Sequence, residues 1–209
     1  MKALLATKLG MTQLFDETGR QSSVTLLSAQ DCVVTQVKNQ TTDGYDAVQV
    51  GMGEAKKLAK PQEGHLKKAG SKSRHLAEFR LQENTSDVPS VGDKLNAENF
   101  ELGELVTVQA VSKGKGFAGT VKRHNFNTGP KTHGSHNYRA PGSIGAGYPQ
   151  HVFKGQKMAG RMGHDTVSVK NLKVVFIDAK ANIIGIRAVS YTHLRAHETK
   201  ANLVCRLLL

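Results

Sequence analysis

The sequence predicts a mainly β fold with some α-helix and one long, extended, basic segment. Three observations lead to this prediction. Short runs of Val, Ile and Leu alternate with turn residues along much of the 209-residue chain. Many short strands at close spacing favour a small β-barrel or sandwich over a βαβ fold. One stretch of 52 residues, in contrast, has no Asp or Glu and few apolar side chains.

The strand candidates are apolar runs that begin and end next to turn residues. In chain order they are Ser23–Leu27, Cys32–Val37, Ala47–Met52, Leu105–Val111, Leu172–Ile177 and Ile183–Ile186. The turn candidates are Asp16–Gly19, Asp43–Gly44, Val91–Asp93 and Ala179–Asn182. Because only Asp178–Asn182 separates the last two runs, these runs are expected to form a hairpin.

The segment Glu54–Ala77 differs from the strand-rich parts of the chain. Its lysines lie among Ala and Gly and are Lys56, Lys57, Lys60, Lys67, Lys68 and Lys72. Pro61 and Gly64 interrupt any long helix, so one or two helical turns in an inserted subdomain are expected. The lysines have two interpretations, a solvated face or a second, weaker nucleic-acid surface.

The basic stretch Ser112–Gly163 holds nine Lys or Arg, four His and eleven Gly, but no acid. Because like charges repel, the compensating anion is expected on a partner. Only six of its residues are Leu, Ile, Val or Phe, which predicts disorder without that partner. Aromatic rings between the cations offer faces for base stacking, at Phe117, Phe126, Tyr138, Tyr148 and Phe153. A polyphosphate surface is the simplest partner.

The rest of the chain is close to neutral, because it carries all 17 acidic residues and 20 basic ones. The net charge of +12 and the pI of about 9.8 are therefore concentrated in one segment. This distribution favours nucleic acid as the partner over a merely solvated charged face. The neutral part is expected to bury a core and fold, with the basic stretch as an extension from it.

Cysteine usage and hydropathy predict a location. Cys32 and Cys205 are far apart and outside any CxxC spacing, which predicts a reducing compartment and no disulfide framework. The N-terminal sequence MKALLATKLGMTQLF is interrupted too soon for a signal peptide. No run of 18 apolar residues occurs. A soluble cytosolic protein without a membrane span is expected.

One glycine pattern tests an enzymatic alternative. Gly114–Val121 matches G-x-G-x-x-G-x-V after a predicted strand. A dinucleotide fold needs a helix and then an acid about 20 residues later, yet no acid precedes Asp165. The VAIK, HRD and DFG motifs of a protein kinase are absent. Gly155–Gly160 fails as a P-loop because Arg161 follows it. A nucleotide-binding enzyme at the Gly114–Gly119 turn remains the minor alternative.

The histidines of the basic stretch test a metal site. His133 and His136 in THGSH lack further ligands at zinc spacing, because the stretch has no Cys or carboxylate. Donation to phosphates or 2′-hydroxyls is the preferred interpretation. No acid pairs with a His near a Ser or Cys nucleophile. The sequence therefore predicts no enzyme, no catalytic residue, no metal and no cofactor.

Long motifs give the chain a resemblance to a known family. They are KLGMTQLF from Lys8, VTQVK at Val34–Lys38, DGYDAVQVG at Asp43–Gly51, GH-x-x-KAG at Gly64–Gly70, SKGKGFAGTVKRHNF from Ser112, THGSH, PGSIG and VFKGQKMAGRMG at Val152–Gly163. In these motifs Met1–Arg187 resembles the bacterial type of large-subunit ribosomal protein three. The resemblance implies a six-stranded translation-protein β-barrel with an inserted small α/β subdomain and a long extended basic loop.

The resemblance also implies a division of the chain. The barrel is expected from residues 1–53, 96–111 and 164–187, the inserted α/β subdomain from 54–95, the rRNA-binding loop from 112–163 and an atypical tail from 188–209.

By the same resemblance, the protein is a structural constituent of the large ribosomal subunit. It is expected to bind 23S rRNA near its 3′ end, help nucleate 50S assembly and extend its loop toward the peptidyl-transferase centre. Neighbouring large-subunit ribosomal proteins, such as proteins fourteen and nineteen, are expected partners. The protein is expected to be cytoplasmic and ribosome-bound, with no membrane partner and no small-molecule substrate. The candidate rRNA-binding residues are Lys113, Lys115, Phe117, Lys122, Arg123, His124, Phe126, Lys131, His133, His136, Arg139, Lys154, Lys157 and Arg161.

Two departures from the family pattern matter. Some members methylate a loop glutamine within a pattern that ends Thr-Pro-Gly, but Gln150 does not occupy the matching position. After Arg187 the family continues with a Gly/Pro-rich turn and a closing strand, whereas this chain has AVSYTHLRAHETKANLVCRLLL at Ala188–Leu209. We hypothesise that this tail is not native to the gene; lineage-specific divergence is the alternative. A foreign tail would leave an exposed barrel edge.

Three classes of function therefore compete. They are a structural rRNA-binding protein, a nucleotide-dependent enzyme and a general DNA-binding protein. Tight magnesium-dependent nucleotide binding would favour the second. Equal affinity for duplex DNA and structured rRNA would favour the third.

Overall fold

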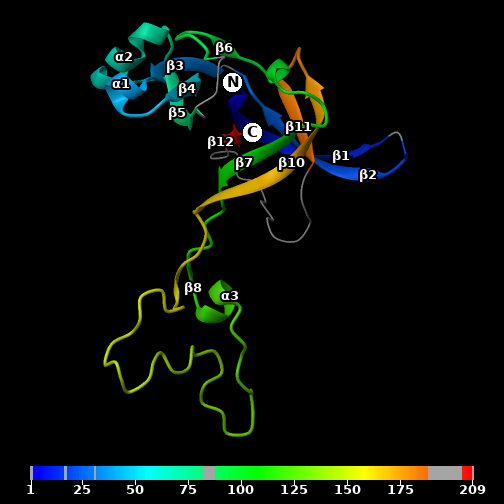
Figure 1. The fold of residues 1–209 in the computed structure, drawn as a ribbon. Helices are drawn as coiled ribbons and strands as arrows, with labels where there is room; N and C mark the ends of the chain where they lie inside the picture. Colours follow the sequence, from blue (N-terminus) through cyan, green and yellow to red (C-terminus); the bar gives the residue numbers. More distant parts are fainter. Residues whose placement is uncertain (1, 17, 31, 82–87, 188–203, 209) are drawn as a thin grey trace. The chain divides into compact units, whose positions relative to one another are not determined.

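The computed structural model describes residues 2–16, 18–30, 32–81, 88–187 and, as backbone alone, 204–208. The chain forms two compact units, Met1–Val111 with Thr166–Leu209, and Ser112–Asp165. The first unit is mainly β, which confirms the predicted fold class (Figure 1). Among the described residues, no helix is long and apolar enough to cross a membrane.

Six strands of the first unit pair in one antiparallel ring. They are β1 (Ala3–Phe15), β2 (Gln21–Ser28), β7 (Leu105–Val111), β10 (Thr166–Asp178), β11 (Ile183–Arg187) and β12 (Val204–Leu208). The order β1–β12–β7–β10–β11–β2 returns to β1 because β2 also pairs with β1. A bulge between Lys8 and Gly10 shifts the register of that pair.

The other four strands of this unit form a separate antiparallel sheet in the order β5–β4–β3–β6. They are β3 (Cys32–Lys38), β4 (Ala47–Glu54), β5 (Ser73–Arg80) and β6 (Lys94–Leu95). Short helices lie between and after them, namely α1 (Gln40–Asp43), α2 (Lys60–Leu66), η1 (Lys67–Ala69) and η2 (Ala97–Asn99). β3 and β4, which precede the expected boundary at residue 53, pair with β5 and β6 and not with the ring, while the division into domains stays a prediction. Apolar runs identify strands but not their partners. Residues 82–87 of the expected subdomain lie outside the described residues.

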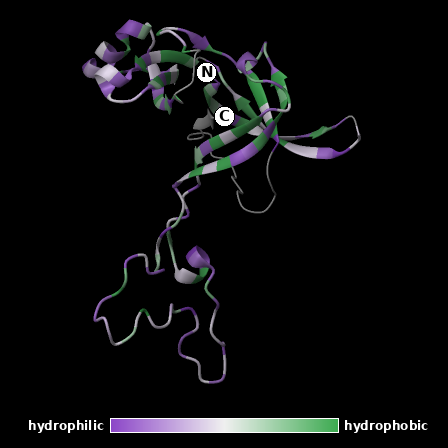
Figure 2. Cartoon of the chain, in the orientation of Figure 1, coloured by the Kyte–Doolittle hydropathy of each residue, from purple (hydrophilic) through white to green (hydrophobic). Residues whose placement is uncertain are grey.

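One hydrophobic core joins the two sheets of the first unit. Leu4, Leu27 and Ile184 from the ring and Val50 and Phe79 from the second sheet are all at most 2% exposed. Figure 2 shows apolar residues concentrated on these strands, while Ser112–Asp165 is mostly polar or intermediate in hydropathy. The chain therefore keeps its hydrophobic burial apart from its basic stretch.

All six predicted strand runs lie within strands of the structure, and the predicted hairpin is the β10–β11 pair. The expected helical turns are α2 and η1. Among the strands of eight or more residues, the prediction missed β1 and β5. The bulge at Lys8 breaks the alternation of β1, and His, Glu and Arg interrupt the apolar pattern of β5.

The atypical tail contributes β12, which pairs with β1 and β7. An exposed edge between those two strands is therefore absent from the part of the chain that the structure describes. Backbone pairing needs only an extended segment with free N–H and C=O groups, whatever the origin of its sequence. The other tail residues, 188–203 and 209, lie outside the described residues.

Candidate nucleic-acid interface

The second unit, Ser112–Asp165, begins and ends in a short antiparallel stem. β8 (Phe117–Ala118) pairs with β9 (Gly160–Arg161). Between this pair and the ends of the unit, four backbone hydrogen bonds continue the stem. The N–H of Ser112 donates to the carbonyl of Asp165 at 2.9 Å, and the N–H of His164 donates to the carbonyl of Ser112 at 3.1 Å. The N–H of Lys115 donates to the carbonyl of Met162 at 2.8 Å, and the N–H of Met162 donates to the carbonyl of Gly116 at 2.9 Å. The stem brings the two arms of the basic stretch together, so the cations between them form one continuous loop.

Gly163 is a structural requirement of this stem. Its φ is +76°, a conformation that L side chains rarely adopt. A Cβ at this position would also overlap the carbonyl oxygen of Lys113 on the opposite arm. The two arms approach so closely that only glycine fits, which explains one of the many glycines of the stretch.

A single helical turn follows the stem and ties the arms together. α3 (Thr120–His124) ends where Asn125 adopts a left-handed conformation with φ 57°. Arg123 donates from Nη1 to the carbonyl of Met158 at 2.9 Å. Nε2 of His124 lies 3.1 Å from the same oxygen. A Cβ at Gly160 would lie 2.5 Å from Arg123 Nη1, so glycine makes room for the guanidinium.

This arrangement changes the expected role of two candidate residues. Arg123 and His124 are only partly exposed and direct donors toward a backbone carbonyl of the opposite arm. Their first role in the structure is to hold the loop. No local sequence pattern predicts this contact, because Met158 lies 35 residues from Arg123.

The other cationic candidates are exposed. They are Lys113, Lys115, Lys122, Lys131, His133, His136, Arg139, Lys154, Lys157 and Arg161. Residues 112–163, all of which the structure describes, contain no carboxylate that could neutralise them. An exposed chain of uncompensated cations attracts a polyanion and is costly to hold together without one.

Aromatic rings lie between these cations with different degrees of exposure. Phe117 is 81% exposed, whereas Phe126 is half-buried with its ring 6.1 Å from that of His124. Lys131 Nζ lies 5.6 Å from the ring centre of Tyr138, within cation–π range. Tyr148 is 87% exposed, more than either phenylalanine among the candidates. Tyr148 and Phe117 therefore have the exposed rings that base stacking would need, and the stacking itself stays a prediction.

The structure gives the histidine pair no additional metal-ligand set. Among the described residues, no three His, Cys, Asp or Glu side chains gather in a group that could hold a metal ion. His133 and His136 are both exposed on the loop. Exposed imidazoles are available as hydrogen-bond partners for an anionic surface.

The glycine turn at Gly114–Gly119 does not have the geometry of a nucleotide site. The strand within it, β8, pairs antiparallel with β9, whereas a dinucleotide fold needs parallel strands around a helix. α3 has only five residues.

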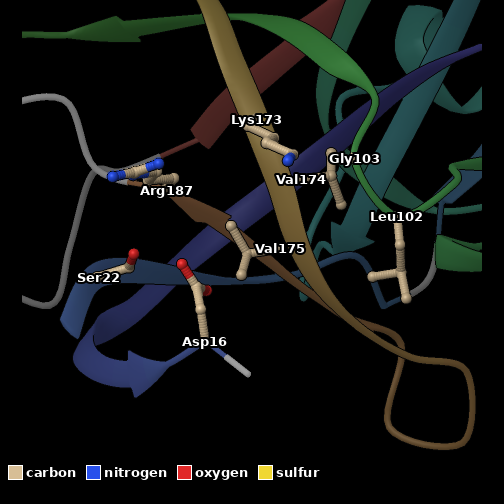
Figure 3. A pocket seen from close by; sticks show the side chains of 8 residues that line it. All are labelled: Asp16, Ser22, Leu102, Gly103, Lys173, Val174, Val175 and Arg187. Carbon is tan, nitrogen blue, oxygen red and sulfur yellow. The ribbon is translucent and has the colours of Figure 1, made fainter. Parts of the chain in front are cut away.

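A surface hollow of about 310 Å³ lies in the first unit (Figure 3). Its lining residues all come from that unit, so it includes no residue of the glycine turn. They are Asp16, Ser22, Leu102, Gly103, Lys173, Val174, Val175 and Arg187.

Two cations of the first unit show a different pattern, because each forms a close ion pair. Lys38 Nζ lies 2.6 Å from Glu78 Oε1 and 2.7 Å from the Tyr45 hydroxyl. The hydrogen bond from Lys38 holds the pKa of Glu78 below its usual value, and the bond to Glu78 raises the pKa of Lys38. Lys2 similarly lies 2.8 Å from Glu104. These charges are compensated within the chain.

Comparison with known proteins gives consistent matches over most of the chain. The family model described as ribosomal protein L3 matches residues 36–193. A protein of Herpetosiphon aurantiacus named large ribosomal subunit protein uL3 is 48% identical over 193 residues, 90% of this chain and 89% of that protein. The uL3 of Geobacter sulfurreducens is 49% identical, with 89% and 90% covered. A uL3c of Phaeodactylum tricornutum is 47% identical, with 88% and 90% covered.

Proposed function

Because this chain belongs to the ribosomal protein L3 family and is a protein of the large ribosomal subunit, we propose that it works there as a structural rRNA-binding protein. Its proposed ligand is 23S rRNA near the 3′ end. The observation that carries the proposal is the loop of exposed cations without a single carboxylate over residues 112–163.

The affinity would come mainly from phosphate contacts. Each Lys or Arg that meets a phosphate releases condensed counterions, so binding weakens steeply as salt rises. If about 6–10 phosphates are engaged, affinity falls by roughly 10³–10⁵ between about 50 and 200 mM salt. The loop offers enough exposed Lys and Arg side chains for this range, among them Lys122, Arg139 and Lys154.

Selection of RNA over DNA would come from shape, 2′-hydroxyls and stacking, since side chains do not reach into the deep major groove of A-form RNA. Phe117 and Tyr148 offer the most exposed rings for unstacked bases. The exposed imidazoles of His133 and His136 suit phosphate or 2′-hydroxyl contacts. In this proposal the protein fixes RNA folds and RNA does the chemistry.

The ring of six strands would be the translation-protein β-barrel of the family, and the sheet β5–β4–β3–β6 its inserted α/β subdomain. The 112–163 loop would reach toward the peptidyl-transferase centre, and the barrel would contact large-subunit proteins fourteen and nineteen. The protein would help nucleate 50S assembly and reside in cytoplasmic ribosomes.

The tail Ala188–Leu209 would be foreign to the gene. Resequencing the locus tests this, because a genuine in-frame tail in genomic DNA would refute it.

The proposed function is tested by competition between two nucleic acids. A fragment of large-subunit rRNA covering the 3′ domain competes with duplex DNA of equal length for the full chain at one moderate salt concentration. Preference for the rRNA supports the proposal. Equal binding to both would favour a general DNA-binding or polycation behaviour and contradict it.

A further inference from the structure

A second group of cations lies in the first unit, on the connection between β4 and β5. This connection, Ala55–Lys72, carries six lysines and one acid, Glu63. The lysines are Lys56, Lys57, Lys60, Lys67, Lys68 and Lys72, and all are exposed. The group is separate from the 112–163 loop, which belongs to the other unit.

Backbone pairing confines these lysines to one small region. Glu54 and Ser73 are paired residues of β4 and β5, and the N–H of Ala55 donates to the carbonyl of Lys72 at 2.9 Å. The connection therefore leaves the sheet and returns to it at one point. Consequently, the lysines near its start and the lysine at its end lie next to each other.

The connection is also anchored, so its lysines are presented from a fixed backbone. α2 leads directly into η1, and Leu66, the last residue of α2, is 1% exposed. Gly70 ends η1 in a left-handed conformation that turns the chain back toward β5. With Leu66 buried, Lys67 and Lys68 extend from the exposed part of the same turn.

None of these lysines forms an ion pair with a described carboxylate, in contrast to Lys38 in the neighbouring strand β3. Glu63 and Lys67 have the four-residue spacing that supports helical ion pairs, yet the structure does not pair them. The positive charge of the connection is therefore uncompensated in the described part of the chain, as it is in the loop.

We propose that Ala55–Lys72 is a second RNA-contacting surface that binds the phosphate backbone of structured RNA. The inference rests on the proposed function and adds a contact on the other unit. This connection has no Phe, Tyr or Trp, so it offers no stacking face and reads no bases. It neutralises phosphates at a second point, while the aromatic-containing loop supplies the stacking contacts.

The test compares two full-length variants with equal loss of charge. One carries Lys56→Gln, Lys57→Gln, Lys67→Gln and Lys68→Gln. The matched control replaces four exposed lysines of the same unit outside this connection, Lys94, Lys170, Lys173 and Lys180, with Gln. Affinity for the 3′-domain rRNA fragment is measured across a salt series, with thermal unfolding as a check on folding.

The salt slope of the first variant is expected to fall by about 3, since each phosphate contact contributes about 0.7–0.9. The control is expected to keep the slope of the unmodified chain. Equal slopes in the two variants would overturn the inference while leaving the proposed function intact. Failure of the unmodified chain to prefer rRNA over DNA would instead contradict the proposed function.

A second measurement reads the surface directly. Acetylation by an amine-reactive reagent is followed at each lysine by mass spectrometry, with and without the rRNA fragment. Lys67 and Lys68 are expected to be protected severalfold, while Lys94 and Lys180 stay reactive. Unchanged reactivity at Lys67 and Lys68 in the complex would refute the proposal, even if the substitutions altered affinity.

Discussion

The β3–β5 sheet and the 112–163 loop use lysine in opposite ways. In the sheet, Lys38 lies 2.6 Å from a Glu78 carboxylate and 2.7 Å from the hydroxyl of Tyr45, so its charge is balanced within the fold. In the loop, Lys122 and Lys154 are exposed and have no carboxylate in the whole segment. A charge compensated within the chain stabilises the fold, whereas a segment that gathers many cations without a carboxylate indicates a partner.

The aromatic residues show the same difference between the two regions. Phe79 is 1% exposed in the core of the first unit, whereas Phe117 is 81% exposed on the loop. Burial of a phenylalanine contributes to folding. An exposed ring contributes nothing comparable and remains available for stacking.

The largest expected effect comes from two matched substitutions, one of a buried and one of an exposed phenylalanine. Phe79→Ala should lower the free energy of unfolding by about 3–5 kcal/mol, because it leaves a cavity in the core. Phe117→Ala should leave unfolding unchanged and weaken rRNA binding by about 1–3 kcal/mol through lost stacking. Urea unfolding and rRNA titration of both variants check this. A loss of stability in Phe117→Ala would contradict the assigned roles.

A smaller effect is expected inside the loop, at two neighbouring cations. Arg123 ties the arms through the Met158 carbonyl, whereas Lys122 is exposed and makes no such bond. Arg123→Ala should lose about 1.5 kcal/mol of local stability and speed proteolysis of the loop about tenfold. Lys122→Ala should leave the cleavage rate unchanged and reduce only the salt slope of RNA binding. Equal cleavage of the two variants would show that Arg123 does not hold the loop.

The smallest effect concerns the pH dependence of the compensated pair. Because Lys38 lowers the pKa of Glu78, the ion pair stabilises the fold at pH values above the usual carboxyl pKa. That stabilisation is lost as the pH falls through the lowered pKa of Glu78. The raised pKa of Lys38 means that its contribution holds below the usual lysine pKa and is lost as pH rises through the raised value. Lys38→Gln should therefore have a lower free energy of unfolding than the unmodified chain near pH 7. This difference in free energy should become smaller at acid and at strongly alkaline pH.

Urea unfolding of the unmodified chain and Lys38→Gln at a series of pH values measures this effect. The same variant should keep the salt slope of RNA binding, since Lys38 is compensated within the chain. A constant stability difference across the acid range would contradict the proposed coupling to Glu78.

Local features of the fold, including one hairpin, could be predicted from the sequence, but pairings between strands that lie far apart in the chain could not. The β10–β11 hairpin follows from two apolar runs and the turn between them, which are all close in sequence. The placement of β3 and β4 in a second sheet depends on pairing with β5, whose alternation is interrupted by charged residues. Partner choice is a tertiary property that short apolar runs do not encode.

The candidate site divides in the same way. Composition alone predicts the exposed cations, because a segment without acids or a core cannot bury them. The contact from Arg123 to Met158 spans the loop and has no local signature. Gly163 owes its identity to a backbone carbonyl of the opposite arm, and Gly160 lies against the guanidinium of Arg123. The roles of these residues could be recognised only from the structure.

The salt dependence of rRNA binding tests the central claim most directly. The full chain is compared with a version in which Gly116–Met162 is replaced by a short linker, which removes seven Lys or Arg and keeps the first unit with its core. If the loop cations meet phosphates, the slope of log affinity against log salt should fall by about 5 in the shortened chain. An unchanged slope would show that the basic loop does not carry the electrostatics of binding and would contradict the account.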